Sequence, residues 1–285
     1  MESTELLLGE EHLAGCLALS KSANWNQNEA DWRLMLGIGR GWGVALADGT
    51  LAASTLALPY GGEFAWISMV LVLREHRRKG FATQLLKKTL RENAGLRRTS
   101  ILDATPAGHK VYVQEGFRDT WGFKRFALRS PATGLDPGRV VRAMSERDWP
   151  AILTLDRRAF GASREPVLRN LASRVPAAAL VAERDGRVSG FLLARDGREA
   201  RQLGPLVAGD AHTAGQLLNA GLAMVRAPVY VDIADHAALL QSWTLARGFE
   251  FQRPFTRMVH VDGAVPARAP GDASLVYCPA GPELG

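Results

Sequence analysis

The spacing of hydrophobic and polar residues changes between positions 66 and 94, and the change predicts a buried strand followed by an amphipathic helix. The run Trp66–Leu73 has eight residues without a charge and several β-formers, which is typical of a strand buried on both faces. From Gly80 onward the apolar residues recur at helical spacing over 81–90, with basic side chains on the opposite face. The pattern therefore predicts a helix that begins at Gly80, after a strand and a short turn.

The turn between this strand and this helix is basic, with the sequence Arg77-Arg78-Lys79-Gly80. Because glycine has no side chain, the backbone can approach a ligand closely at Gly80. The first amides of a helix lack intrahelical partners and lie at the positive end of the helix dipole, so they favour an anion such as a pyrophosphate. The alternative interpretation is that the three basic residues form a solvated charge run between two elements.

The basic turn resembles the acetyl-CoA signature of the GNAT N-acetyltransferases, which is Gln or Arg, two residues, Gly, one residue, and Gly or Ala. Arg77, Gly80 and Ala82 fill the defined positions, and Thr83 is the small polar residue that follows. The place of the motif, after a buried strand and at a helix start, makes the match more specific. Two competing phosphate loops, the Rossmann G-x-G-x-x-G turn and the P-loop G-x-x-x-x-G-K-S/T, do not occur.

A second GNAT motif follows the first, at the distance that many domains of this family show. The motif is Tyr112-x-x-x-Gly116-Phe117, and it overlaps the end of a short helix predicted over 109–115. One short strand, Thr99–Leu102, separates this motif from the basic turn. Two motifs in the right order make the resemblance strong. In chain order it implies paired helices, strands at Trp42–Ala47 and Leu51–Leu58 joined by a hairpin turn, the motif strand and helix, and a closing strand at Arg118–Leu128.

The chain then repeats features of its first half. An arginine lies nine positions after the glycine of a Gly-Phe pair, at Gly116 and Arg125 and again at Gly248 and Arg257. We therefore predict an α/β chain of two GNAT-like domains, each a central, mostly antiparallel, twisted sheet flanked by helices. The predicted bounds are a GNAT acetyl-CoA-binding catalytic domain at 1–129, a turn-rich linker at 130–138, a degenerate GNAT-like domain at 139–262, and a C-terminal tail at 263–285 that wraps the surface or stays mobile.

The second copy lacks the residues that would hold the cofactor, although Asp232 repeats the strand-end position of Asp103. After the predicted strand Arg201–Val207 there is no arginine, and Asp210 stands where a phosphate would sit, which is repulsive at close range. Thr244, rather than a tyrosine, stands four residues before the glycine of the second Gly-Phe pair. The second domain is therefore expected to cover the first active site, shape substrate choice, or form a homodimer.

The resemblance also implies roles for residues of the first domain. Tyr112 is the candidate general acid, because the tyrosine of this motif often faces the sulfur of CoA. Glu63, before the motif strand, and Asp103, at the end of the next strand, are candidate bases, directly or through water. The simpler alternatives are a packing role for Tyr112 and turn-capping roles for the two carboxylates. The residues expected to bind acetyl-CoA are Met69, Val70, Leu71, Val72, Arg77, Arg78, Lys79, Gly80, Phe81, Ala82 and Thr83. The first four are expected to act through their main chain, which would also hold the developing oxyanion.

The loop between the first two helices usually lines the acceptor site in GNAT folds. Here that loop spans 22–28, and Asn24 and Trp25 are the candidate substrate-binding residues. In the alternative interpretation Trp25 staples the two helices together. The sequence does not distinguish a small amine or amino acid from a peptide N-terminus.

Composition limits the other possibilities. A chain of 285 residues is long enough for two domains that each bury a core. It has no apolar run of the roughly eighteen residues that cross a membrane and no secretory segment. Two cysteines are too few for a disulfide framework, so the cytoplasm is the expected compartment. The basic residues behind the net charge of +6 are scattered, so we expect no nucleic-acid partner, no membrane partner and no metal.

Two functions are consistent with these features. The first is an N-acetyltransferase that moves an acetyl group from acetyl-CoA to a primary amine of a small molecule or peptide, by direct attack on the thioester, with catalysis confined to the first domain. The second is a non-catalytic acyl-CoA-binding or protein-interaction module. The presence of Tyr112 together with Arg77, Gly80 and Ala82 favours the enzyme.

Overall fold

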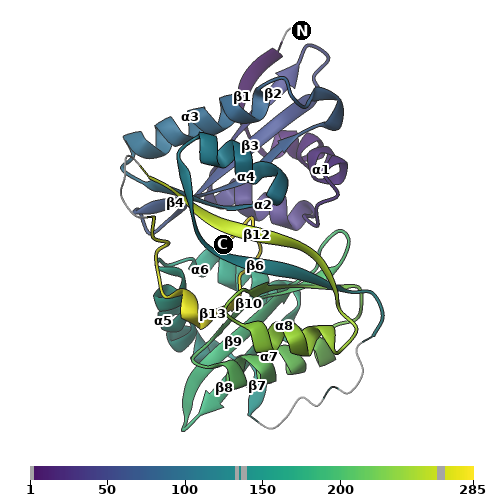
Figure 1. Cartoon of the computed structure of the whole chain (residues 1–285), viewed down its shortest axis with the longest axis vertical. Helices are drawn as coiled ribbons and strands as arrows, with labels where there is room; N and C mark the ends of the chain where they lie inside the picture. The colour runs from purple at the N-terminus through teal and green to yellow at the C-terminus, as the bar shows by residue number, and fades with distance from the viewer. Residues whose placement is uncertain (1–2, 132–134, 136–139, 262–266) are drawn as a thin grey trace.

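The computed structural model describes residues 3–131, 135, 140–261 and 267–285 (Figure 1). Most of the predicted linker and the start of the predicted tail therefore lie outside the described residues. The first half of the chain forms β1 Ser3–Leu8, α1 Leu13–Ser22, α2 Glu29–Ile38, β2 Arg40–Leu46, β3 Leu51–Tyr60, β4 Phe64–Val72, α3 Phe81–Gly95, β5 Thr99–Ala104, α4 Pro106–Gln114 and β6 Phe117–Leu128. The second half forms β7 Val141–Ala143, α5 Trp149–Phe160, α6 Glu165–Arg174, β8 Leu180–Arg184, β9 Arg187–Arg195, β10 Arg201–Ala208, α7 Ala211–Met224, β11 Val229–Ala234, α8 Ala238–Leu245, β12 Glu250–His260 and β13 Val276–Cys278.

The strands in these described ranges form one continuous thirteen-stranded sheet. Its order is β1-β2-β3-β4-β5-β12-β6-β11-β10-β9-β8-β7, and β13 pairs with β10 beside this path. The described pairs are antiparallel except for β4–β5 and β10–β11, which are parallel. The predicted fold class, a mixed α/β chain with mostly antiparallel sheets flanked by helices, is confirmed.

The two halves of the chain exchange their last strands. Strand β12 of the second half lies between β5 and β6, and strand β6 of the first half lies between β12 and β11. Figure 1 shows β6 and β12 side by side across the middle of the molecule. Strands β1–β5 thus continue into β12, and strands β7–β11 continue into β6, so both halves have the same strand order. The predicted closing strand exists, but it completes the sheet of the other half.

The local elements around the basic turn form as the hydrophobic pattern predicts. Helix α3 starts directly after Gly80, and Leu85 and Leu86 of its apolar stripe are fully buried. The expectation that the chain begins with paired helices is wrong, because β1 precedes α1 and pairs with β2. Most residues of β1 are exposed or half-buried at the edge of the sheet, so the segment lacks the one-sided pattern of a half-buried strand.

The two halves meet through an aromatic core. Tyr60, Phe64 and Trp66 of the first half surround Phe160 of the second, with ring centroids 4.9, 5.5 and 6.0 Å from it. Such pairs add stabilisation to the burial of the rings themselves, on the order of 0.5–1.5 kcal/mol each. The contact between the halves is therefore part of the hydrophobic core of the molecule.

The C-terminal segment runs through the interior between the halves. Strand β13 is antiparallel to β10, and residues 275–281 and 283–285 are buried. The C-terminus lies in the middle of the molecule in Figure 1. The expectation of a tail on the surface is therefore wrong for these residues. Their apolar run is too short to show the alternation of apolar and polar residues that indicates a strand.

Three further features of the described residues concern the expected compartment and cofactors. Cys16 and Cys278 are both buried free thiols. No helix in the described ranges is long and apolar enough to cross a membrane. In the same ranges, no three His, Cys, Asp or Glu side chains group in a way that could hold a metal ion.

Candidate active site

Strands β4 and β5 separate part-way along their length and leave a gap in the sheet. They pair only over Phe64–Trp66 and Thr99–Ile101. Beyond that point β4 bulges at Met69, whose φ of 51° is left-handed, and the Ser54 hydroxyl donates a hydrogen bond of 2.7 Å to the Met69 carbonyl. Since the described pairing with β5 ends before the bulge, the edge of Met69–Val72 that faces the gap is available to a ligand.

The basic turn begins helix α3 next to this gap. Arg78 and Gly80 have φ angles of 62° and 86°, and Gly80 caps α3 without a side-chain hydrogen bond. A Cβ built on Gly80 would meet no described atom within 4 Å, so the space beside it is open. Uncapped helix amides next to open space are the arrangement that binds a phosphate.

An outer cavity of about 670 Å³ lies between the basic turn, β4 and α4. Its size is within the range of ligand sites, about 300–1,000 Å³. The predicted cofactor residues that line it are Val70, Leu71, Val72, Arg77, Arg78, Gly80, Phe81, Ala82 and Thr83. Two predicted residues do not: Met69 lines a second cavity, and Lys79 instead contacts His76 Nδ1 at 3.1 Å.

A small inner cavity of about 30 Å³ adjoins the outer one. The wall residues common to both cavities are Trp25, Val70, Asp103, Thr105, Tyr112 and Arg253. The rest of the inner wall is formed by Asn26, Gln27, Ile67, Ser68, Met69, Leu102, Arg125, Phe255, Pro282 and Glu283. Both halves of the chain and the C-terminal segment therefore enclose the inner cavity.

Tyr112 lies on α4 at the boundary between the two cavities. Its ring packs edge-on against Phe117, with centroids 5.8 Å apart, and a Cβ on Gly108 would lie only 2.8 Å from the ring. Burial raises the pKa of Tyr112, so its hydroxyl stays protonated at neutral pH. The side chain is thus held in place as a hydrogen-bond donor beside the point where the cavities meet.

Asp103 also lines both cavities, but its two oxygens accept hydrogen bonds from Arg257, at 2.9 Å from Nε and 3.0 Å from Nη2. The pair has a counterpart in the second half, where Asp232 accepts two hydrogen bonds of 2.7 Å from Arg125. Each arginine lies on an exchanged strand, so the repeated residues form two matched ion pairs between the halves. Burial raises the pKa of Asp103, with Arg257 acting against the rise. The same pair occurs in the copy without the motifs, so joining the strands does not depend on the motif residues.

Two other predicted site residues lie outside the cavities. Glu63 is exposed in the turn before β4, roughly 20 Å along the strand from Val70 at the usual rise per residue. It is therefore too far from the gap to act as the base. Asn24 is exposed and lines neither cavity, whereas the adjacent Trp25 lines both.

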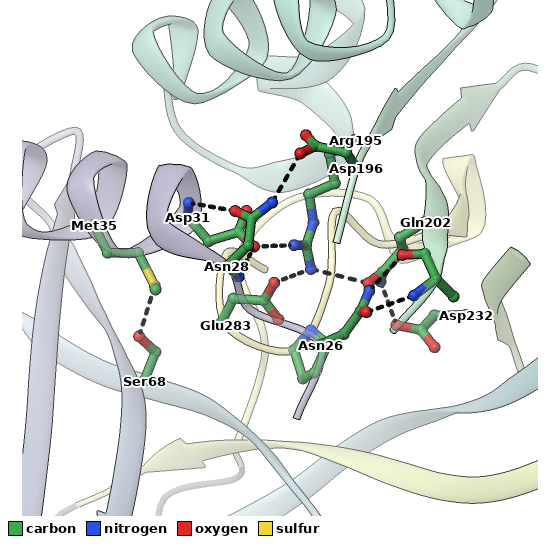
Figure 2. Close-up of polar contacts among 12 residues, drawn as sticks. Asn26, Asn28, Asp31, Met35, Ser68, Arg195, Asp196, Gln202, Asp232 and Glu283 are labelled. Atoms are coloured by element: carbon green, nitrogen blue, oxygen red, sulfur yellow. Dashed lines mark hydrogen bonds and ion pairs between the residues drawn. The ribbon is translucent and has the colours of Figure 1, made fainter. Parts of the chain in front are cut away.

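Sequence reasoning missed a buried network of charged and amide side chains that reaches the inner cavity through Glu283 (Figure 2). Arg195 donates hydrogen bonds to Asp31 and Glu283 and, at 2.9 Å, to Gln202. Gln202 donates in turn to Asp232 at 2.9 Å. These residues come from α2, β9, the C-terminal segment, β10 and β11. The sequence gives only a weak signal for these residues: some of them are charged positions inside otherwise apolar runs.

The equivalent gap in the second half is filled by the protein itself. Strands β10 and β11 pair only over Arg201–Leu203 and Val229–Val231, and β13 then pairs with β10 at Leu206 and Val207. The amide of Thr213, at the start of α7, donates to the Asp210 carboxylate at 2.8 Å. A peptide strand and an acidic cap thus occupy the positions that are open in the first half.

Comparison with known proteins gives the family. The sequence model described as Acetyltransferase (GNAT) family matches residues 10–117, and the one described as Acetyltransferase (GNAT) domain matches residues 152–270. The chain belongs to the GNAT acetyltransferase family. It carries two GNAT domains in tandem, as its repeat predicts, and it is an acyltransferase.

A curated relative and several solved structures extend over both GNAT domains. The chain is 25% identical over 248 residues to the protein named Uncharacterized N-acetyltransferase YitH of Bacillus subtilis, which covers 85% of this chain and 86% of the relative. A putative acetyltransferase from Pyrococcus horikoshii has a TM-score of 0.78 at 20% identity, over 99% of this chain and 96% of the other. A tandem GNAT protein from the clavulanic acid biosynthesis pathway has a TM-score of 0.64 at 16% identity, over 93% and 100% of the two chains. The two structures show that the tandem fold is shared.

Proposed function

We propose that this GNAT protein transfers the acetyl group of acetyl-CoA to a primary amine of a small molecule or peptide. The observation that carries the proposal is the outer cavity, which brings the basic turn, the open start of α3 and the β4 bulge to one space. A bound pyrophosphate fits the turn, because Arg77 and Arg78 supply positive charge and Gly80 leaves the space open. The thioester end would then lie at the gap, beside Tyr112.

The roles of the protein groups follow from this placement. Main-chain amides of β4 at the bulge stabilise the negative charge that develops on the thioester oxygen. The Tyr112 hydroxyl donates to the departing sulfur. An acceptor amine must reach the thioester from the inner cavity, because the outer cavity holds the cofactor. The position of Tyr112 at the junction of two cavities favours catalysis over the alternative of a module that only binds acyl-CoA.

The substitution Gly80→Asp tests the cofactor site. It adds a side chain and a negative charge where a pyrophosphate would contact bare amides, so acetyl-CoA affinity should fall by about tenfold or more. Gly62→Asp is a matched control, because Gly62 has a φ of 89°, close to the 86° of Gly80, and both have open space at Cβ. Calorimetric titration should show lost binding only in Gly80→Asp, with similar melting temperatures for both variants. Unchanged acetyl-CoA affinity in folded Gly80→Asp would refute the site.

A second pair of variants tests the assignment of the cofactor to the first half. Arg77→Ala should weaken acetyl-CoA binding, since Arg77 lines the outer cavity. His212→Ala, at the equivalent helix start of the second half, should leave acetyl-CoA affinity unchanged. Asp210 and β13 already occupy the gap and the helix start of that half. Steady thiol release with members of an amine panel then distinguishes an enzyme from a binding module. Acetyl-CoA bound in the second half would contradict the assignment.

A further inference from the structure

Three polar side-chain atoms are buried, belong to residues that line the inner cavity, and have no hydrogen-bond partner among the described residues. They are Glu283 Oε2, Gln27 Oε1 and Arg253 Nε. Glu283 and Gln27 are each only 2% exposed. A buried polar atom without a partner costs about 1–3 kcal/mol, so three such atoms around one small space indicate a ligand that pairs with them.

Glu283 is held rigidly against the cavity by its neighbours. Its other oxygen accepts from Arg195 (Figure 2), the Pro282 carbonyl accepts from Trp66 Nε1 at 3.0 Å, and the Leu284 carbonyl accepts from the Tyr60 hydroxyl at 3.1 Å. These contacts fix the main chain on both sides of the carboxylate. Oε2 is therefore a positioned acceptor to which no described residue donates.

The two unpartnered oxygens have the same requirement, which is a donor. Glu283 Oε2 and Gln27 Oε1 can accept hydrogen bonds but cannot donate them in the assigned orientation. A primary amine supplies two or three N–H donors on one small atom. An amine placed between these oxygens would be next to Val70 and Tyr112, which line the same cavity and the outer one.

Arg253 has the opposite requirement. It lies on the exchanged strand β12 and lines both cavities, and its buried Nε donor has no partner in the part of the chain that the structure describes. Burial lowers the pKa of Arg253, and the neighbouring Arg125 cation adds to the effect, so a nearby anion would be stabilising. Arginine binds carboxylates through paired N–H groups.

We propose that the inner cavity is the acceptor site and that it takes a compact compound with both a primary amine and a carboxylate. The amine donates to Glu283 and Gln27, and the carboxylate accepts from Arg253. The inner cavity is small, about 30 Å³, so a compact acceptor fits it better than a folded protein N-terminus. This inference rests on the proposed acetyl transfer and specifies its acceptor.

Glu283 is then the catalytic base. The ammonium group of the acceptor gives one proton to the Glu283 carboxylate, which passes it to solvent. The neutral nitrogen forms a bond to the thioester carbonyl carbon, and the carbon–sulfur bond breaks. The nitrogen loses a second proton and the sulfur gains one, so the products are an N-acetylated amino acid, the free thiol and one released proton.

An acceptor panel tests the chemical class. Each of the twenty standard amino acids, β-alanine and γ-aminobutyrate is compared with its own amide by thiol release. The best free carboxylate should have a kcat/KM about 10- to 150-fold above its amide, the scale of one hydrogen bond to a charged group. Equal rates for acids and amides, or preference for peptides, would overturn the acceptor class while leaving acetyl transfer intact. If no amine in the panel supports thiol release, the proposed function is contradicted as well.

Variants of the two charged residues complete the test. Arg253→Gln should weaken calorimetric binding of the best amino acid, measured with CoA present, by about tenfold or more and leave its amide unaffected. Glu283→Gln should lower turnover about a hundredfold or more without changing acetyl-CoA affinity. Arg247→Gln and Glu250→Gln are matched controls, because Arg247 stacks on Trp243 and Glu250 pairs with a surface arginine, outside both cavities. Should Glu283→Gln unfold, Gln27→Leu removes the other acceptor oxygen and should weaken amino-acid binding. Variants that bind and turn over amino acids like the parent would refute the inference.

Discussion

The hydroxyl of Tyr112 gives the sharpest test of the catalytic arrangement. Tyr112→Phe removes one oxygen and keeps the ring that packs against Phe117 at 5.8 Å and over Gly108. Packing should therefore change little, and acetyl-CoA should bind with unchanged affinity. Any loss of turnover then reports on the hydroxyl alone.

The size of that loss follows from acidity. A tyrosine has an ordinary pKa of about 10 and a thiol about 8.5, and burial raises the pKa of Tyr112 further. Complete proton transfer from Tyr112 to the thiolate is therefore uphill, and its main contribution is a hydrogen bond to a developing charge. Such a bond is worth about 1.5–3 kcal/mol, so kcat should fall about 10- to 150-fold.

The assay is steady-state thiol release at saturating acetyl-CoA, with Tyr277→Phe as a matched control. Tyr277 is a buried tyrosine of β13 that lines neither cavity, so its variant should keep parental activity. Full activity of Tyr112→Phe would reduce Tyr112 to a packing residue. If acetyl-CoA affinity falls by the same factor as kcat, or if the melting temperature drops, the hydroxyl does not act on turnover alone, and the assignment is contradicted.

Two further predictions concern stability. Asp232→Asn leaves the buried Arg125 without its counter-charge and should lower the free energy of unfolding in urea by about 3–5 kcal/mol, whereas the surface change Asp235→Asn should cost less than about 1 kcal/mol. Hydrogen bonds from Arg142 hold the pKa of Asp148 well below its usual range, so the stabilisation from this pair is present above about pH 4 and is lost as the pH falls. Asp148→Asn should therefore melt below the parent at pH 7, and the difference should shrink between pH 4 and pH 2.5; a difference that persists at low pH would contradict the assignment.

The elements near the basic turn could be predicted because their signals are local. The period change at Gly80 and the motif residues around it lie within about twenty positions, and the structure forms the strand and helix there. The tandem repeat was also visible, since Arg125 and Arg257 occupy matching positions. Both elements and repeat could thus be derived without knowing any contact between distant residues.

The parts that could not be predicted depend on contacts between distant residues. Asp103 has the position of a catalytic carboxylate in the sequence, and only its partner Arg257, 154 positions away, shows that both of its oxygens are engaged. Strands β6 and β12 have similar patterns, so their exchange leaves no trace in either segment. Glu283 lies in a short segment without a period, and its burial depends on Trp66 and Tyr60.

The strand exchange has a consequence for how the chain is made. Strand β5 is complete about 150 residues before β12, its neighbour in the finished sheet, has been synthesised. At the usual 5–20 residues per second, this separation corresponds to roughly 8–30 s on the ribosome. During that interval β5 exposes an unpaired edge, which can pair with other chains. The first GNAT sheet is therefore a late product of translation, completed only when the second half has emerged.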